Sequence, residues 1–365
     1  MANSAVAQWQ KDIVMRSNFS VGMYPASVPV QDNPYIPTLV SAIKKKNIDV
    51  KNCNVLNPNI NQAVLHVHWL ERIFHTRLGS RSNLVAKLFS YNVLRAAERT
   101  RRAGGKVVWT AHNLYPHDNL NDGQRKVWDE FSRDFWALVS DVFTLSSTAE
   151  SQIKQELPQV SNKQFHLVYH QNFVDFFKGF AEKRTFRTRH GIPDDAILFS
   201  LTGYLKPYKQ VDNVIRHFLD ANIKNAYLVV AGRCSESYLA TLESSRRGMR
   251  TVVILPKSFS HGEMVDLVSS SDASVFNFRR IFNSGSVISS LSVGTPVILS
   301  RTPGMLELAE MSGSGSYHFY DGDLQPNVFH SAVEKFKNQE ISPSNLSMFD
   351  PAIVAERHLR GYGLV

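Results

Sequence analysis

The turn from Gly203 to Lys209 carries residue types suited to binding an anion. It follows the apolar segment Ile197–Leu201, which predicts a strand, and precedes Val211–Phe218, which predicts a helix. A tight turn at the start of a helix presents backbone N–H groups and the positive end of the helix dipole to an anion. Lys206 and Lys209 add positive charge, so the turn predicts a diphosphate site at these residues. The alternative is an ordinary strand-to-helix turn with two solvated lysines.

A second loop of small residues lies further along the chain. The segment Ala273–Phe276 predicts a buried strand, and the loop that follows contains Asn283, Ser284, Gly285 and Ser286. Ser and Asn are good N-caps, and glycine lets a ligand approach the backbone closely. Because the carboxyl ends of parallel strands meet at one edge of a sheet, both predicted helix starts can converge on a single anionic ligand. The competing interpretation is a capped helix without a ligand.

Apolar segments alternate with helical patterns along the whole chain, which is typical of parallel sheets covered by helices on both faces. The predicted strands of the first half are Ile13–Met15, Val64–Val67, Lys106–Thr110, Val142–Leu145 and His166–Tyr169. Those of the second half are Ile197–Leu201, Ala226–Val230, Thr251–Leu255, Ala273–Phe276, Pro296–Leu299 and Tyr317–Phe319. The charged segment Phe173–Ile192 interrupts this rhythm and predicts a domain boundary.

The order of these segments resembles a known family. Residues 197–325, with Tyr227–Gly232, Val253–Pro256 and Gly294–Ile298, resemble the nucleotide-sugar-binding domain of GT-B-fold glycosyltransferases. The first half is similar to bacterial exopolysaccharide-type transferases through His66–Trp69 and Trp109–His117. The resemblance implies an α/β fold in which two Rossmann-like domains face a central cleft. It places an acceptor-binding domain at 1–180, a nucleotide-sugar-binding domain at 181–350, and a last helix at 351–365 that crosses back to the first domain.

The resemblance also implies a function. A hexose would pass from a UDP- or GDP-linked donor to a lipid-linked or oligosaccharide acceptor in cell-surface polysaccharide synthesis. Helix ends and lysines would stabilise the leaving diphosphate, so neither a divalent metal nor a cofactor is expected. The alternative is a sugar-nucleotide epimerase, or another non-transferase enzyme, of the same fold.

Histidines lie at the ends of two predicted strands of the first domain: His66 and His68 flank the end of one, and His112 and His117 follow the end of the other. Strand ends in parallel sheets face the ligand crevice, and the resemblance singles out His112 as the residue near the reacting sugar. Proton removal from the acceptor hydroxyl also calls for a base. Asp118 is our first candidate for a carboxylate base and Glu71 the second.

Further donor-binding residues are expected in the second domain. Arg233, Phe259 and Glu263 follow predicted strands and are expected to contact the nucleoside, and Arg280 the diphosphate or a charged sugar. Two features depart from the retaining branch of the family: its pair of glutamates is replaced by Ile281 and Ser289, and an arginine of its first turn by Tyr204. Both stereochemical outcomes therefore stay open.

The chain has 365 residues, 43% apolar and 20% charged, with a net charge of +9. Of the partners that suit a basic protein, nucleic acid lacks any recognition motif here, and a dinucleotide is disfavoured by the absence of Gly-x-Gly-x-x-Gly. An anionic membrane surface fits the basic segment 81–106, in which Leu84, Leu88, Tyr91 and Leu94 recur at helical spacing. No apolar segment is long enough to span a membrane, and no signal peptide is recognised. We expect a cytoplasmic protein that contacts the inner face of the cell membrane.

Overall fold

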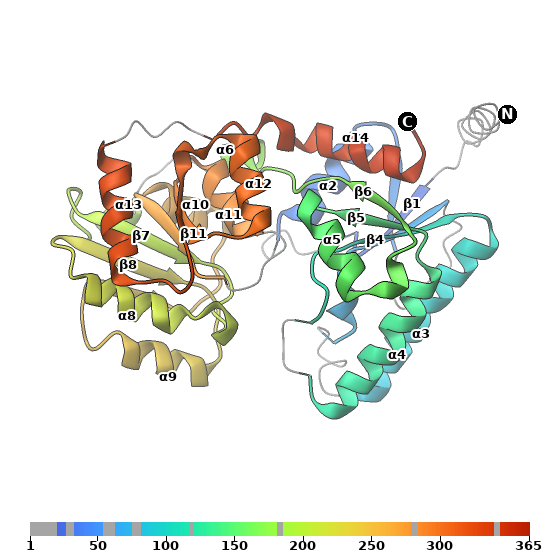
Figure 1. Cartoon of the computed structure of the whole chain (residues 1–365), viewed down its shortest axis with the longest axis horizontal. Helices are drawn as coiled ribbons and strands as arrows, with labels where there is room; N and C mark the ends of the chain where they lie inside the picture. Colours follow the sequence, from blue (N-terminus) through green and yellow to red (C-terminus); the bar gives the residue numbers. More distant parts are fainter. Residues whose placement is uncertain are drawn as a thin grey trace. The chain divides into compact units, whose positions relative to one another are not determined.

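The structure, a computed structural model, describes residues 20–26, 33–53, 63–74, 82–116, 120–180, 185–278, 284–338 and 344–365. The chain forms two compact units (Figure 1). The first comprises Met1–Gln171 and Phe349–Val365, and the second Asn172–Met348. The predicted domain limits at residues 180 and 350 remain a prediction.

The first unit contains a six-stranded, fully parallel sheet in the order β2-β1-β3-β4-β5-β6. Its strands are β1 (Ser20–Tyr24), β2 (Asp49–Asn52), β3 (Val64–Val67), β4 (Lys106–Thr110), β5 (Asp141–Thr144) and β6 (Gln164–Leu167). Its helices include α2 (Tyr35–Lys44), α3 (Asn83–Arg102), α4 (Asp122–Leu138), α5 (Ser147–Glu156) and α14 (Pro351–Tyr362), with a short 3₁₀ helix η1 (Leu70–Ile73). Helix α3 packs against α4, and α14 against α2.

Helix α14 is held tightly on the first sheet, although it comes from the end of the chain. The Lys106 ammonium donates to the carbonyl of Gly361 at 3.0 Å and pairs with Asp141 at 3.2 Å. A Cβ atom on Gly361 would lie 2.4 Å from the ring of Phe143, so only glycine fits there. The C-terminal segment therefore completes the first unit.

The second unit contains another parallel sheet, in the order β12-β11-β10-β7-β8-β9. Its strands are β7 (Ile197–Thr202), β8 (Ala226–Ala231), β9 (Val252–Leu255), β10 (Ala273–Phe276), β11 (Val297–Ser300) and β12 (Tyr317–Tyr320). Its helices are α6 (Val174–Lys178), α7 (Phe186–Arg189), α8 (Val211–Ala221), α9 (Glu236–Ser245), α10 (His261–Ser269), α11 (Gly285–Ser292), α12 (Pro303–Ser312) and α13 (Pro326–Asn338).

Strand β7 shows why this sheet is buried on both faces. Phe199 and Leu201 join the larger apolar cluster of the second unit, while Leu198 joins a smaller one. Successive side chains of a strand point to opposite faces, so an uninterrupted apolar segment requires a covering layer on each side. Helices supply both layers.

The predicted α/β class with two Rossmann-like domains is confirmed. Strands β1 and β2 were not predicted from the sequence. Strand β2 has one buried residue, Val50, and β1 carries Ser20 and Gly22, which are poor strand signals. The predicted strand Ile13–Met15 lies outside the described residues.

Candidate functional site

The second unit has a topological switch point between β7 and β10. From β7 the chain adds β8 and β9 on one side, then returns to place β10 against the other side of β7. In open parallel sheets, ligands bind outside the carboxyl ends of the strands at such a point. The amide of Asn277, after β10, donates to the Gln210 side chain at 3.4 Å and so links the two loops at this crevice. Neither residue was singled out from the sequence.

Gly203 marks the point where the two predicted anion loops meet. Its φ is +111°, a conformation that favours glycine. A Cβ atom built on Gly203 would lie 3.3 Å from the Ser286 hydroxyl oxygen and 3.4 Å from the Lys209 ammonium nitrogen. The structure therefore brings these three sequence-predicted residues together above one turn.

Gly232 allows the loop after β8 to approach that turn. Its φ is +150°, and a Cβ atom on it would lie 1.8 Å from the carbonyl oxygen of Gly203. The Gly203 N–H donates to the carbonyl of Ala231 at 3.1 Å, which holds the two loops in register. Any larger residue at position 232 would displace the backbone of the Gly203 turn.

Several positive charges lie close together at this turn. Burial and the nearby Lys206 ammonium lower the pKa of Lys209 to about 8. Lys206 and Arg233 both lie over the ring of Tyr204, at 5.2 and 5.1 Å from its centre. Tyr204 stands where the resembled family has an arginine, and Arg233, from the loop after β8, places a guanidinium at the same turn.

Helix α11 directs its amino end at the same turn. Ser284 is buried and caps the helix, with its hydroxyl accepting from the Val287 N–H at 3.2 Å. The hydroxyl of Ser290 donates to Ser274 on β10 at 3.0 Å, so small serine side chains seat the helix on the sheet. The cap engages Val287, and the N–H groups of Gly285 and Ser286 have no intrahelical acceptor because they lie in the first turn.

Helix α8 contributes less to an anion site than the sequence suggested. Its first N–H, that of Val211, donates to the Tyr238 hydroxyl at 3.1 Å, and that hydroxyl donates to Asp212 at 3.0 Å. A carboxylate already lies at the positive end of this helix, paired with Arg216 at 2.7 Å. Anion binding at the Gly203 turn is therefore left to the lysines and to α11.

Of the remaining residues predicted to bind the donor, some lie along the same edge of the sheet and the others lie outside the described residues. Phe259 follows β9, with the Lys257 ammonium 4.9 Å from its ring centre. Glu263 closes the cap of α10 with Ser260 and pairs with Lys257 at 2.7 Å, which lowers the pKa of its carboxyl to about 2. A role of Glu263 in binding ribose has to coexist with these contacts. Arg280 and Asn283 lie outside the described residues.

The first unit gathers a buried cluster of five histidines, which we name the histidine cluster. His66 and His68 end β3, His112 follows β4, His170 follows β6, and His358 comes from α14. His112 Nε2 lies 3.1 Å from His68 Nδ1, and the His112 ring stacks on Trp69 with centres 4.4 Å apart. His66 bridges the hydroxyls of Thr110 and Tyr362, each at 2.6 Å. His358 was not predicted as part of a site, since nothing local distinguishes it.

Burial keeps the histidine cluster neutral. Burial, with neighbouring histidines, lowers the pKa of His66, His68 and His112 well below the usual value. Burial also lowers the pKa of His170 and of His358 to about 4. No group of three or more His, Cys, Asp or Glu side chains in the described ranges is arranged to hold a metal ion.

Of the two predicted carboxylate bases, the structure describes Glu71. Glu71 is 7% exposed, and its carboxylate accepts from the side-chain amide of Asn113, the neighbour of His112, at 2.7 Å. Glu71 and His112 are therefore held near one another at the carboxyl ends of β3 and β4. Asp118 and His117 lie outside the described residues.

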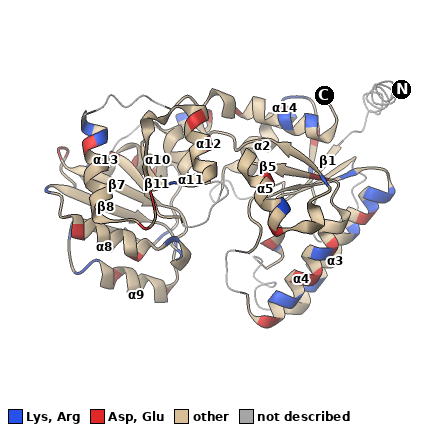
Figure 2. Cartoon of the chain, viewed as in Figure 1, with Lys and Arg blue, Asp and Glu red and all other residues tan. Residues whose placement is uncertain are grey.

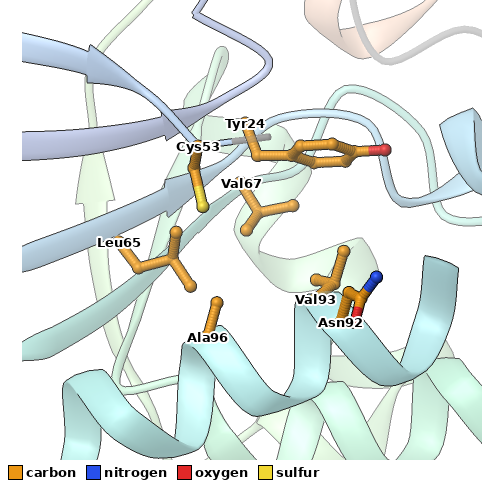
Figure 3. A pocket seen from close by; sticks show the side chains of 7 residues that line it. All are labelled: Tyr24, Cys53, Leu65, Val67, Asn92, Val93 and Ala96. Atoms are coloured by element: carbon orange, nitrogen blue, oxygen red, sulfur yellow. The ribbon is translucent and has the colours of Figure 1, made fainter. Parts of the chain in front are cut away.

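A small pocket lies between the first sheet and the buried face of α3 (Figure 3). Its lining comes from β1, β3, α3 and the residue after β2, and comprises Tyr24, Cys53, Leu65, Val67, Asn92, Val93 and Ala96. Most of these side chains are apolar, which does not suit acid–base chemistry. The catalytic candidates among the described residues therefore remain the histidine cluster and Glu71, and Asp118 remains a candidate outside them.

The outer face of α3 exposes both apolar and basic side chains. Leu84, Leu88 and Tyr91 are 69, 54 and 55% exposed and lie on one side of the helix. Figure 2 shows basic residues along the same helix, and Lys87 and Arg95 of α3 are exposed. The other predicted stripe residue, Leu94, is half-buried, and Phe89, which follows Leu88 in the sequence, is buried. Within the described ranges, no helix combines the length and hydropathy of a membrane span.

Comparison with known proteins agrees with this architecture. Residues 182–348 match the family model described as "Glycosyl transferases group 1". The chain is 22% identical over 304 residues to a GDP-mannose:glycolipid 4-beta-D-mannosyltransferase of Xanthomonas campestris pv. campestris, covering 82% of this chain and 79% of the relative.

Solved structures share the fold at low sequence identity. Sucrose-phosphate synthase from Thermosynechococcus elongatus superposes with a TM-score of 0.64 and 11% identity, over 95% of this chain and 97% of the other. HepE from Anabaena, in complex with UDP and glucose, gives a TM-score of 0.62 and 11% identity over 94 and 99% of the two chains. The chain thus shares the GT-B fold with these structures, and the family match over residues 182–348 supports a GT-B glycosyltransferase.

Proposed function

We propose that this glycosyltransferase moves a hexose from a UDP- or GDP-linked donor to a glycolipid acceptor at the cytoplasmic face of the cell membrane, in cell-surface polysaccharide synthesis. The observation that carries the proposal is the convergence of the Lys209 ammonium and the Ser286 hydroxyl above Gly203. The amides of the first turn of α11 lie in the same place. These groups are donors or cations, which suits the developing charge on a leaving diphosphate.

The donor set also favours a reaction that needs no divalent metal. The Gly203 turn brings together Lys206, Lys209 and Arg233, and in this proposal these cations neutralise the diphosphate in place of a metal. The nucleoside would extend along the sheet edge toward the loops after β8 and β9, where Arg233 and Phe259 lie. The relative's use of GDP-mannose makes this donor the first to test.

In the first unit, His112 and Glu71 are the residues we assign to the acceptor side. Both are held at the carboxyl ends of β3 and β4, and the contact between Glu71 and Asn113 links them. Of the two candidates for the base that accepts the proton of the acceptor hydroxyl, Glu71 lies within the described residues and Asp118 lies outside them.

A binding experiment tests the donor site. Replacing Lys209 by Ala removes one charge-assisted contact, worth about 1.5–3 kcal/mol, and should weaken binding of UDP or GDP by about 10–150-fold in calorimetry. Lys224→Ala is the matched control, because Lys224 is exposed and precedes β8 at the opposite end of the sheet. Equal affinities of the two variants would reject the proposed diphosphate site.

Product analysis separates transfer from epimerisation. Incubation with GDP-mannose or UDP-glucose and a lipid extract should yield a glycosylated lipid and free nucleoside diphosphate, measured by mass spectrometry. Conversion of the donor sugar into its epimer without release of diphosphate would instead support the epimerase alternative.

The acceptor proposal places α3 on an anionic bilayer. The exposed stripe of Leu84, Leu88 and Tyr91 suits the boundary between headgroups and acyl chains, and each basic residue near the surface adds about 1 kcal/mol. In vesicle flotation, binding should require anionic lipid and fall at high salt. A variant with Leu84→Ser and Leu88→Ser should lose at least tenfold in membrane partition, whereas Leu306→Ser, a control at an exposed leucine of the second unit, should not. Equal flotation of both variants would exclude α3 as the contact.

A further inference from the structure

The contact between His68 and His112 constrains where each neutral ring carries its proton. One of the two facing nitrogens, His68 Nδ1 and His112 Nε2, must donate to the other across 3.1 Å. The remaining nitrogen of His68, Nε2, is buried and has no hydrogen-bond partner among the described residues. The rings of His66, Trp69 and Tyr35 lie around the His68 ring, with distances between ring centres of 4.1, 5.7 and 5.7 Å.

The two possible arrangements differ in which kind of atom is left unpaired. If His112 Nε2 donated, His68 would carry its proton on Nε2 as a buried N–H without an acceptor. If His68 Nδ1 donates, its Nε2 is an unpaired acceptor instead. Orphaned buried N–H groups are rarer than under-satisfied acceptors, so the second arrangement is favoured.

We infer that His68 is a positioning residue that fixes His112 in the neutral form protonated on Nδ1. His112 then presents a hydrogen-bond donor at Nδ1, while its only lone pair, at Nε2, accepts from His68. A histidine in this form can donate to a sugar or acceptor oxygen but cannot remove a proton. The base of the reaction must therefore be another group.

The network reaches beyond this pair. The His68 ring packs on His66, and His66 is bridged to the Tyr362 hydroxyl of α14 and to Thr110 of β4. Both rings of the pair are thus held by elements that lie far apart in the sequence. Such outer partners of a functional histidine set its tautomer and orientation, and their loss typically costs 10–100-fold at metal sites, a scale we adopt here.

Nuclear magnetic resonance measures the tautomer directly. Protein labelled with ¹⁵N-histidine should show a protonated Nδ1 and an unprotonated Nε2 for His112 at neutral pH, with the signals assigned by their loss in His112→Asn. A proton on Nε2, or on both nitrogens, would overturn the inference. This readout needs no substrate, so it stands apart from any failure of the proposed glycosyl transfer.

Two nearly isosteric variants test the role of His68. His68→Asn places an amide donor near the position of Nδ1, and His68→Asp places an acceptor there. The Asn variant should keep the proton of His112 on Nδ1, and the Asp variant should move it to Nε2, with kcat about 10–100-fold below that of the Asn variant. The same tautomer of His112 in both variants would refute the assignment. Should the Asp variant not fold, the wild-type spectrum decides alone.

The inference rests on the proposed function only for the substrate that His112 faces. A protein with the expected tautomer but no nucleotide-sugar activity would retain the inference and lose the function. An active transferase whose His112 carries its proton on Nε2 would support the proposed function and overturn the inference.

Discussion

The lowered pKa of Lys209 predicts that donor binding weakens as pH rises from 7 to 9. Burial and the Lys206 ammonium lower this pKa to about 8 in the free protein. The lysine is then charged in about nine molecules of ten at pH 7 and in about one of ten at pH 9. An anion bound beside it favours the charged form and raises its pKa. Binding therefore takes up a proton above pH 8.

The size of the effect follows from these populations. If the nucleoside diphosphate binds only the charged form, its Kd should increase about tenfold between pH 7 and 9, which is about 1.4 kcal/mol. The terminal phosphate ionises with a pKa of about 6, so the charge of the ligand changes little over this interval. The change in affinity is therefore assigned to the protein.

Calorimetry at pH 8.5 in two buffers of different ionisation enthalpy measures both Kd and proton uptake. Lys209→Arg is the matched control, because a guanidinium stays charged throughout this interval. Its Kd should be independent of pH from 7 to 9, and it should take up no proton. A wild-type Kd that is constant from pH 7 to 9, or the same tenfold increase in the Arg variant, would refute the assignment to Lys209.

Three further predictions concern packing and metal. Gly232→Ala puts a Cβ atom 1.8 Å from the Gly203 carbonyl oxygen. Nucleotide affinity, measured by calorimetry, should therefore fall severalfold, and the free energy of unfolding, measured in urea, should fall by about 1–3 kcal/mol. An unchanged affinity and an unchanged unfolding free energy would contradict the packing. Gly361→Ala, 2.4 Å from the Phe143 ring, should lower stability by a similar amount with nucleotide affinity unchanged, because it disturbs only the first unit. Transfer activity should persist in excess EDTA, and a loss restored by Mg²⁺ would show that the cations of the Gly203 turn do not suffice.

Local sequence signals predicted the elements and loops that form the donor site. Continuous apolar strands followed by Gly203 and by the Ser284–Ser286 loop predicted where two strands end. The parallel topology then required these ends to meet at one edge. This part of the site needed no knowledge of long-range contacts, and the structure places Gly203, Lys209 and Ser286 together.

The features that the sequence did not reveal depend on contacts between distant residues. The Tyr238 hydroxyl accepts from the first N–H of α8, that of Val211, and so removes the expected anion site at this helix end. The sequence around Val211 gives no sign of this contact. Because α14 packs on the first sheet, His358 belongs to the histidine cluster and the Tyr362 hydroxyl bonds to His66, although both residues come from the end of the chain. Strand β2 was not predicted because an edge strand with one buried residue has almost no hydrophobic pattern.

A crystal structure of the protein with bound UDP or GDP would test the donor site most directly. We predict the diphosphate within hydrogen-bond distance of Lys209 Nζ and Ser286 Oγ, directly above Gly203. A nucleotide bound elsewhere, with the crevice between β7 and β10 left empty at saturating ligand, would contradict the account.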